Sequence, residues 1–233
     1  VPNTGLQVAQ PVSVRLEARS LAGHPVTDFT NAVSLAVAVP GTRPASLLIT
    51  EIQPSAGVEF LNGSTHALDL SGWEVSLYDS STWPRPRTTF VFPPQSAVEA
   101  GKLLVLRPGG TAPGSGSTFF TGQPLNWTFN NANRVIAVLL RDSAGDIVDF
   151  FGADQAFPEA ITEPVSVPIT EWIGRPIARL NTSFDAYQRL SSRDQQAARD
   201  WLVCIESFGK LNPYGGPVFG PGLTVQKLEP AST

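Results

Sequence analysis

The sequence predicts an all-β protein built as an antiparallel β-sandwich, and three observations point to this fold. The chain has 233 residues, of which 42% are hydrophobic and only 15% charged. Its 20 glycines and 21 prolines lie mostly between short stretches in which apolar and polar residues alternate. Alternation with a period of two indicates strands that bury one face. Many such strands joined by glycine- and proline-rich turns are typical of a sandwich.

The expected strands succeed one another steadily after residue 46. They are LLITEI (47–52), VEFLN (58–62), WEVSLYD (73–79), TTFVF (88–92), KLLVLR (102–107), RVIAVLLR (134–141) and DIVDFF (146–151). Residues 152–186 have little periodicity and several prolines, so we expect a long ordered excursion there. Residues 191–201 are expected to hold a short helical turn.

The first forty residues carry three further strand signals, among them VSVRLEAR (12–19) and AVSLAVAV (32–39). Three strands alone leave an apolar face uncovered, so this segment should pack on the next part of the chain or on a neighbour. We therefore divide the chain into a partial sandwich segment at 1–44, a complete β-sandwich domain at 45–215 and a C-terminal linker at 216–233.

The alternation changes phase within DLSGW (69–73). The apolar residues before Ser71 occupy even positions, and those from Trp73 onward occupy odd positions. Both sets can reach one core only if the chain turns or bulges at Ser71-Gly72. Gly72 can adopt a positive φ, and Asp69 and Ser71 can hold such a corner by bonding nearby backbone N–H groups. The corner should deliver Trp73 into the core.

These stretches together resemble the lamin tail domain family in its bacterial form, over residues 46–214. The matching positions are Glu51, Glu59, Asp69 to Trp73, Gly101 to Leu106, Gln188-Arg189, Asp200-Trp201, Phe208-Gly209 and Asn212. Phe208 stands where the family usually has proline. The resemblance implies an immunoglobulin-like antiparallel β-sandwich that serves as an extracellular module of a larger surface or secreted protein. Residues 1–40 are similar to the first half of bacterial immunoglobulin-like repeats.

Charge and cysteine content exclude several classes of function. The formal net charge is −4 and no cluster of Lys and Arg occurs, which disfavours nucleic acid and anionic membranes as partners. No apolar run approaches the roughly 20 residues of a membrane span, so we expect no membrane insertion. Cys204 is the single cysteine, so no intrachain disulfide can form. We expect no cofactor and no metal.

Two pairs of charged residues invite a chemical interpretation. Glu51 and Glu59 fall on adjacent expected strands and could bind Ca²⁺ or perform acid–base catalysis. The alternative, which we favour, is that one of them pairs with an arginine (Arg134, Arg141 or Arg189) while the other is solvated. Arg189 and Asp200 are expected to form an internal structural pair, because a buried arginine rarely lacks a partner.

Three of the five tryptophans fall in loops. Trp83, Trp127 and Trp172 are surrounded by Pro, Asn and Gly, and exposed rings in such loops could bind sugars or a flat protein surface. Loop tryptophans also pack down over the ends of sandwiches, and we favour packing. Trp73 and Trp201 lie in alternating stretches and are expected in the core.

The sequence therefore predicts a non-enzymatic structural or interaction module within a larger bacterial extracellular or cell-surface protein. The expected partners are neighbouring domains of the parent protein, a cell-surface protein or a glycan. The alternative function is a carbohydrate-binding module that uses the three loop tryptophans. An enzyme is a third hypothesis, and it depends only on Glu51 and Glu59.

Overall fold

The computed structural model describes residues 46–127, 134–178, 180, 182, 184–190 and 194–212. The chain divides into two compact units, Val1–Thr42 and Arg43–Thr233, and every described residue belongs to the second. The predicted partial segment at 1–44 and the predicted linker at 216–233 lie outside the described residues.

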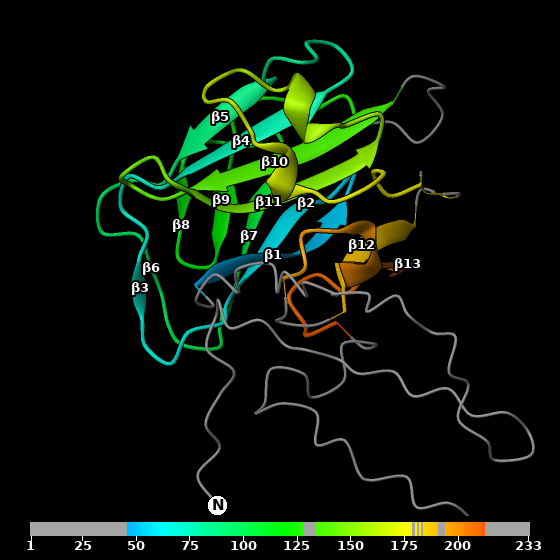
Figure 1. Cartoon of the computed structure of the whole chain (residues 1–233). Coiled ribbons are helices and arrows are strands. Elements are labelled where there is room, and N and C mark those ends of the chain that lie inside the picture. The colour runs from blue at the N-terminus through cyan, green and yellow to red at the C-terminus, as the bar shows by residue number, and fades with distance from the viewer. Residues whose placement is uncertain are drawn as a thin grey trace, which may run out of the picture. The chain divides into compact units, whose positions relative to one another are not determined.

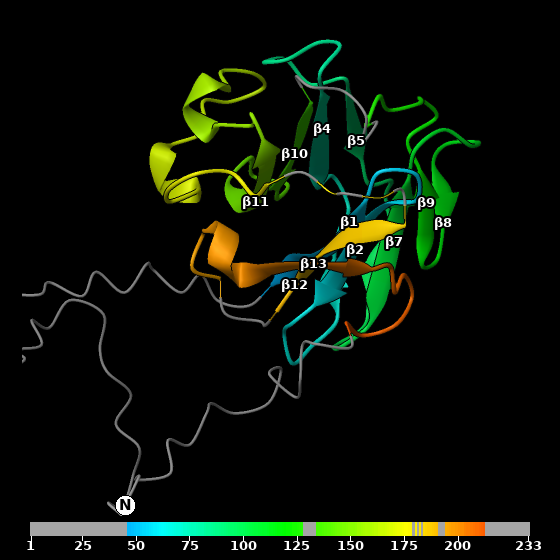
Figure 2. The same ribbon diagram turned by 90° about the vertical axis from the view of Figure 1, so that its right-hand side faces the viewer.

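Two β-sheets stack face to face in the described unit (Figures 1 and 2). The larger sheet has the strand order β13-β12-β1-β2-β7-β9-β8, and the smaller sheet has the order β11-β10-β4-β5. A separate two-stranded ribbon pairs β3 (Leu68–Asp69) with β6 (Ala97–Val98). Neighbouring strands are antiparallel except β7 and β9, which run parallel. The described residues thus form an antiparallel β-sandwich.

All seven strands predicted after residue 46 are present. They are β1 (Leu47–Gln53), β2 (Gly57–Asn62), β4 (Glu74–Asp79), β5 (Thr88–Val91), β7 (Leu103–Arg107), β10 (Val135–Arg141) and β11 (Ile147–Asp154). Four strands that complete the larger sheet were not predicted. They are β8 (Gly114–Ser115), β9 (Thr118–Phe120), β12 (Asp185–Arg189) and β13 (Trp201–Ile205).

The excursion after β11 is ordered where it is described, and it contains two short 3₁₀ helices, η1 (Pro158–Ala160) and η2 (Ile169–Glu171). The helical turn expected within 191–201 is a third 3₁₀ helix, η3 (Ala198–Asp200). No helix among the described residues is long and apolar enough to cross a membrane.

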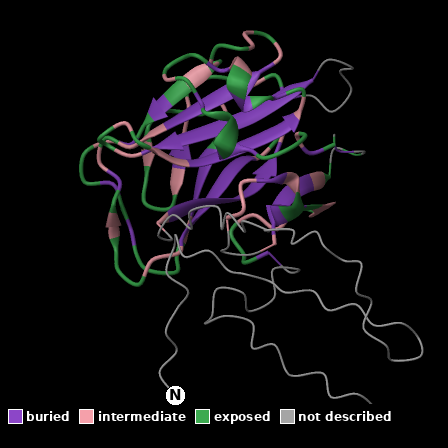
Figure 3. Ribbon diagram, in the orientation of Figure 1, coloured by how far each residue is buried: buried purple, intermediate pink, exposed green. Residues whose placement is uncertain are grey.

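The core lies between the two sheets, and Figure 3 shows the central strands buried over nearly their whole length, namely β1, β2, β4, β10 and β11. The closing strands join it through aromatic contacts: the Phe151 ring on β11 lies 5.1 Å from that of Tyr187 on β12 and 4.6 Å from that of Trp201 on β13. Each large apolar side chain buried here stabilises the fold by about 1.5–3 kcal/mol. The core therefore holds the late strands β12 and β13 onto a sandwich formed by much earlier residues.

The DLSGW corner turns as the change of phase requires. Gly72 has a φ of +77°, and the Trp73 amide donates to the Leu70 carbonyl at 2.9 Å. Asp69 Oδ1 accepts hydrogen bonds from both the amide and the hydroxyl of Ser71, at 2.9 and 2.6 Å. Leu70 is fully buried, whereas the indole of Trp73 packs against the core but is only half-buried. The corner thus seats Leu70 in the core more deeply than Trp73.

Candidate functional site

A β-bulge at Thr50 lies between two clusters of polar residues, one on the inner face of the larger sheet and one on its outer face. Ile49 faces Phe60 on β2 while Glu51 faces Glu59, so Thr50 is the extra residue of β1. A bulge shifts the side chains after it to the opposite face and leaves backbone groups outside the ladder. Ile49 and Glu51 therefore point to opposite faces, one into the sandwich and the other out of it.

On the inner face, the free backbone groups of Ile49 bind a buried ion pair. The Ile49 amide donates to Asp149 Oδ2 at 2.8 Å, and the Ile49 carbonyl accepts from Arg189 Nε at 2.7 Å. Arg189 Nη2 donates to both oxygens of Asp149, at 2.8 and 2.6 Å. Both side chains are 1% exposed. Burial raises the pKa of the Asp149 carboxyl, and the neighbouring guanidinium opposes this rise.

The expected pair of Arg189 with Asp200 is wrong. Arg189 pairs with Asp149 and, at 3.3 Å, with Asp194, and its guanidinium lies 4.7 Å from the centre of the Trp201 ring. The Asp200 carboxylate instead accepts from the amides of Gln195 and Ala197, at 2.8 and 3.3 Å. Asp200 is held by the turn before β13. Burial raises the pKa of its carboxyl, and the Arg189 guanidinium opposes this rise as a nearby charge without forming a hydrogen bond or an ion pair with it.

On the outer face, Glu51 and Glu59 bind the loop after β13. Glu51 accepts from the amide and the hydroxyl of Ser207, at 2.7 and 2.8 Å. Glu59 accepts from the Gly209 amide at 2.6 Å and from the Thr50 hydroxyl at 2.9 Å. Both glutamates are fully buried. Burial raises the pKa of each, that of Glu59 to about 7, although the hydrogen bonds from the loop oppose the rise.

We call this arrangement the carboxylate latch, meaning Glu51 and Glu59 together with residues 206–212. Asn212 completes it by donating to the carbonyl oxygens of Thr50 and Arg189, at 2.9 and 3.1 Å. The bulge thus ties the end of the domain to its first two strands. The latch holds a C-terminal loop across the outer face of β1 and β2.

The latch contradicts the expectation that one glutamate pairs with an arginine and the other is solvated. Arg134 pairs with Asp154, Arg141 with Glu74 and Arg189 with Asp149. The two glutamates are close, yet both are covered by the loop, so a substrate has no access to their oxygens. No group of three or more His, Cys, Asp or Glu residues among the described positions could hold a metal ion.

The three loop tryptophans do not form an open platform. Trp127 is 3% exposed and its indole N–H donates to the Tyr78 carbonyl at 2.7 Å. Trp172 is 1% exposed and its N–H donates to the Arg175 carbonyl at 3.1 Å. Trp83 is half-buried and packs edge-on against Tyr78, with 6.0 Å between ring centres. The sugar-binding alternative thus loses two of its three rings, because the sandwich core holds them.

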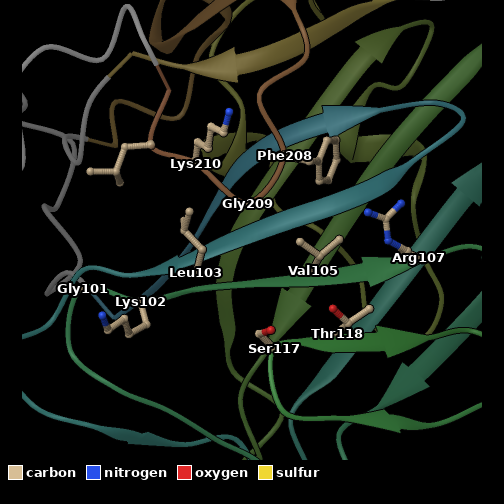
Figure 4. Close-up of a pocket in the computed structure, with 11 residues that line it drawn as sticks. Gly101, Lys102, Leu103, Val105, Arg107, Ser117, Thr118, Phe208, Gly209 and Lys210 are labelled. Atoms are coloured by element: carbon tan, nitrogen blue, oxygen red, sulfur yellow. The ribbon is translucent and has the colours of Figure 1, made fainter.

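The surface feature best suited to a partner is a groove of about 570 Å³ on the outer face of the larger sheet (Figure 4). Leu103 and Val105 of β7 form its floor, because Leu104 and Leu106 face the core. One wall is residues 208–211 of the latched loop, and the other contains Ser117 and Thr118. We call this feature the β7 groove.

Sequence reasoning did not find the β7 groove, because its walls are about a hundred positions apart in the chain. One feature of the sequence could have indicated the groove. The stretches FGKL at 208–211 and GKLLVLR at 101–107 each combine a lysine with apolar residues. The sequence indicated the ion pair more clearly, since Asp149 interrupts the otherwise apolar stretch IVDFF at 147–151. An acid in such a position has to meet a buried cation.

Residues 40–154 match the family model of the Lamin Tail Domain. No curated protein matches the chain. This segment is therefore a lamin tail domain, a family of non-catalytic immunoglobulin-like interaction modules, and the expected all-β, immunoglobulin-like fold is confirmed. The match ends at the last residue of β11, so β12, β13 and the latched loop come after the matched segment and complete its larger sheet.

Proposed function

We propose that this lamin tail domain is a non-catalytic interaction module of a larger bacterial extracellular or cell-surface protein. The observation that carries the proposal is the burial of Glu51 and Glu59, the only pair of carboxylates that the sequence offered for catalysis. Their oxygens are bonded to the Ser207 and Gly209 amides, so they stabilise the fold. What the described residues offer to other molecules is an exposed surface that includes the β7 groove.

The extracellular assignment draws on composition and on the resemblance to bacterial modules. A charged fraction of 15% is low against the roughly 25% of typical soluble domains. Neighbouring domains of the parent protein are the first partners to consider, and a cell-surface protein is the second.

Labelling of intact cells of the source organism tests this proposal. An antibody against residues 46–212 should bind without permeabilisation, and protease added outside should remove the signal. A photo-crosslinking amino acid at Leu211, 58% exposed beside the groove, should join the domain to another polypeptide segment. The same substitution at Val91, 50% exposed on the smaller sheet, is the comparison. Labelling only after permeabilisation, with no crosslink from either position, would contradict the proposal.

A further inference from the structure

The β7 groove gathers positive charge in an acidic chain. Lys102, Arg107 and Lys210 line it, and all three are exposed. Lys102 and Lys210 are two of only three lysines in a sequence whose net charge is −4. In the part of the chain that the structure describes, none of the three cations forms an ion pair, and neither do Arg175 and Arg199, so all three groove cations are available to an acidic partner.

Apolar side chains lie between these cations. Figure 4 shows Leu103 and Val105 between Lys102 and Arg107, with Phe208 across from them on the loop. Leu211, 58% exposed, extends the apolar wall. Val105 is 7% exposed and Leu103 and Phe208 are half-buried, so the apolar lining is partly open to solvent. A partly open apolar lining rimmed by charge marks a binding surface more often than a plain solvated face. The occupant that complements this groove has to combine acidic groups with apolar ones.

The groove cannot accept its occupant as an additional strand. The backbone of β7 is already paired with β2 on one side and with β9 on the other. Affinity must therefore come from side chains that enter the groove. This requirement favours a peptide with alternating acidic and apolar residues over a sulfated glycan, which would satisfy the cations but leave the apolar floor uncovered.

We propose that the β7 groove binds an acidic, extended peptide segment of a partner protein. Lys102 and Arg107 are five residues apart, which in an extended chain corresponds to roughly 16 Å. A peptide of about that length places carboxylates at both ends of the groove and an apolar side chain over Val105, while Lys210 contacts it from the loop. This inference rests on the proposed function and names the chemistry of the partner.

Fluorescence anisotropy with the full chain tests the proposal. The probe is a labelled peptide in which aspartate and leucine alternate, and the matched negative probe carries lysine in place of aspartate. The acidic probe should bind and the lysine probe should not. Binding should weaken as salt is raised, because the contacts are between exposed charges.

Charge reversal on the groove supplies the decisive comparison. The double variant Lys102→Glu/Lys210→Glu should lose at least about tenfold in affinity, because charge reversal turns two attractions into repulsions. Arg85→Glu, with the side chain of Arg85 74% exposed at a distant loop, makes the same kind of change and should bind as the wild type does. Leu211→Ser should weaken binding without changing its dependence on salt.

Three results would overturn the inference. They are no binding of the acidic probe, equal binding by the double variant, and binding of a sulfated oligosaccharide in place of the peptide. Each of these leaves the proposed function intact if intact cells are still labelled and a crosslink still forms from Leu211 or from Val91. Absence of the domain from the cell surface would instead remove the proposed function, whatever the probe does.

Discussion

The two sides of the Thr50 bulge bury carboxylates in different ways. On the inner side, Asp149 is held by the guanidinium of Arg189. On the outer side, Glu51 and Glu59 form no ion pair with any described residue, and they depend on the amides and hydroxyls of Ser207, Gly209 and Thr50. A buried ion pair leaves an uncompensated charge when one partner is removed, whereas a hydrogen-bonded carboxyl can become neutral by taking up a proton. The inner cluster should therefore be the less tolerant of substitution, and both clusters should make stability depend on pH, because burial raises the pKa of Asp149 as well as those of Glu51 and Glu59.

The largest effect should result from splitting the ion pair. Arg189→Ala should lower the free energy of unfolding by about 3–5 kcal/mol, because Asp149 loses its cation and must either stay charged in the core or take up a proton. Urea unfolding measures this loss. Arg85→Ala is the control, since Arg85 and Glu163 form a pair 3.6 Å apart on the surface that should contribute at most about 1 kcal/mol. Equal losses in the two variants would show that the inner pair is not energetically distinct.

A smaller effect should appear as a dependence of stability on pH. Glu59 has a pKa raised from 4.5 to about 7 in the folded state, so between these values the folded protein binds more protons than the unfolded chain. Stability should therefore fall as pH rises through this range, by about 1–3 kcal/mol. Asp149 contributes in the same direction, because burial raises its pKa as well.

The variant Glu59→Gln separates the contribution of Glu59 to the pH dependence of stability from that of Asp149. The amide can still accept from the Gly209 N–H and can donate to the Thr50 hydroxyl, so the variant should fold. Urea midpoints measured at about pH 5 and about pH 8 should differ less in Glu59→Gln than in the wild type. An identical difference in the two proteins would mean that Glu59 does not titrate in this range.

The smallest effect should come from the amide that joins the two clusters. Asn212→Ala removes hydrogen bonds to the carbonyls of Thr50 and Arg189 and should cost about 1–2 kcal/mol, because both acceptors are left buried. Asn126 is the matched control, since among the described residues its side chain bonds Ser81 alone, at 3.2 Å and in an exposed position. Thermal melts of the two alanine variants should rank them in this order. A larger loss of melting temperature in Asn126→Ala than in Asn212→Ala would show that the hydrogen bonds of Asn212 do not stabilise the fold as described.

The sequence was sufficient to predict the strands in which apolar and polar residues alternate, because this alternation indicates one buried face. Val75 and Leu77 of β4 illustrate this, since both are buried at the period of two that predicted them. Strand β12 was not predicted because its inward positions include Arg189, which breaks the apolar pattern. The burial of Arg189 depends on its ion pair with Asp149, forty positions earlier in the chain. The pattern of neighbouring residues cannot indicate a partner so far away in the sequence.

The candidate site could be predicted only in part. The sequence placed Glu51 and Glu59 on neighbouring strands, and the structure pairs them directly across β1 and β2. The sequence did not indicate the bulge at Thr50, which sets the outward direction of Glu51. It also did not indicate the covering loop, whose hydrogen bonds to the glutamates join residues about 150 positions apart. The loop tryptophans were harder to assign, because an indole in a proline-rich loop has the same sequence context whether it is exposed or buried, as Trp172 is.

The most direct test of the carboxylate latch is amide hydrogen exchange at Gly209, with Ile49 as an internal reference. The Gly209 amide donates to Glu59 on the outer side of the bulge, and the Ile49 amide donates to Asp149 on the inner side. In the wild type both amides should be protected. In Glu59→Ala, exchange at Gly209 should become fast while Ile49 stays slow. Unchanged exchange at Gly209 in that variant would contradict the claim that the buried glutamates hold the loop.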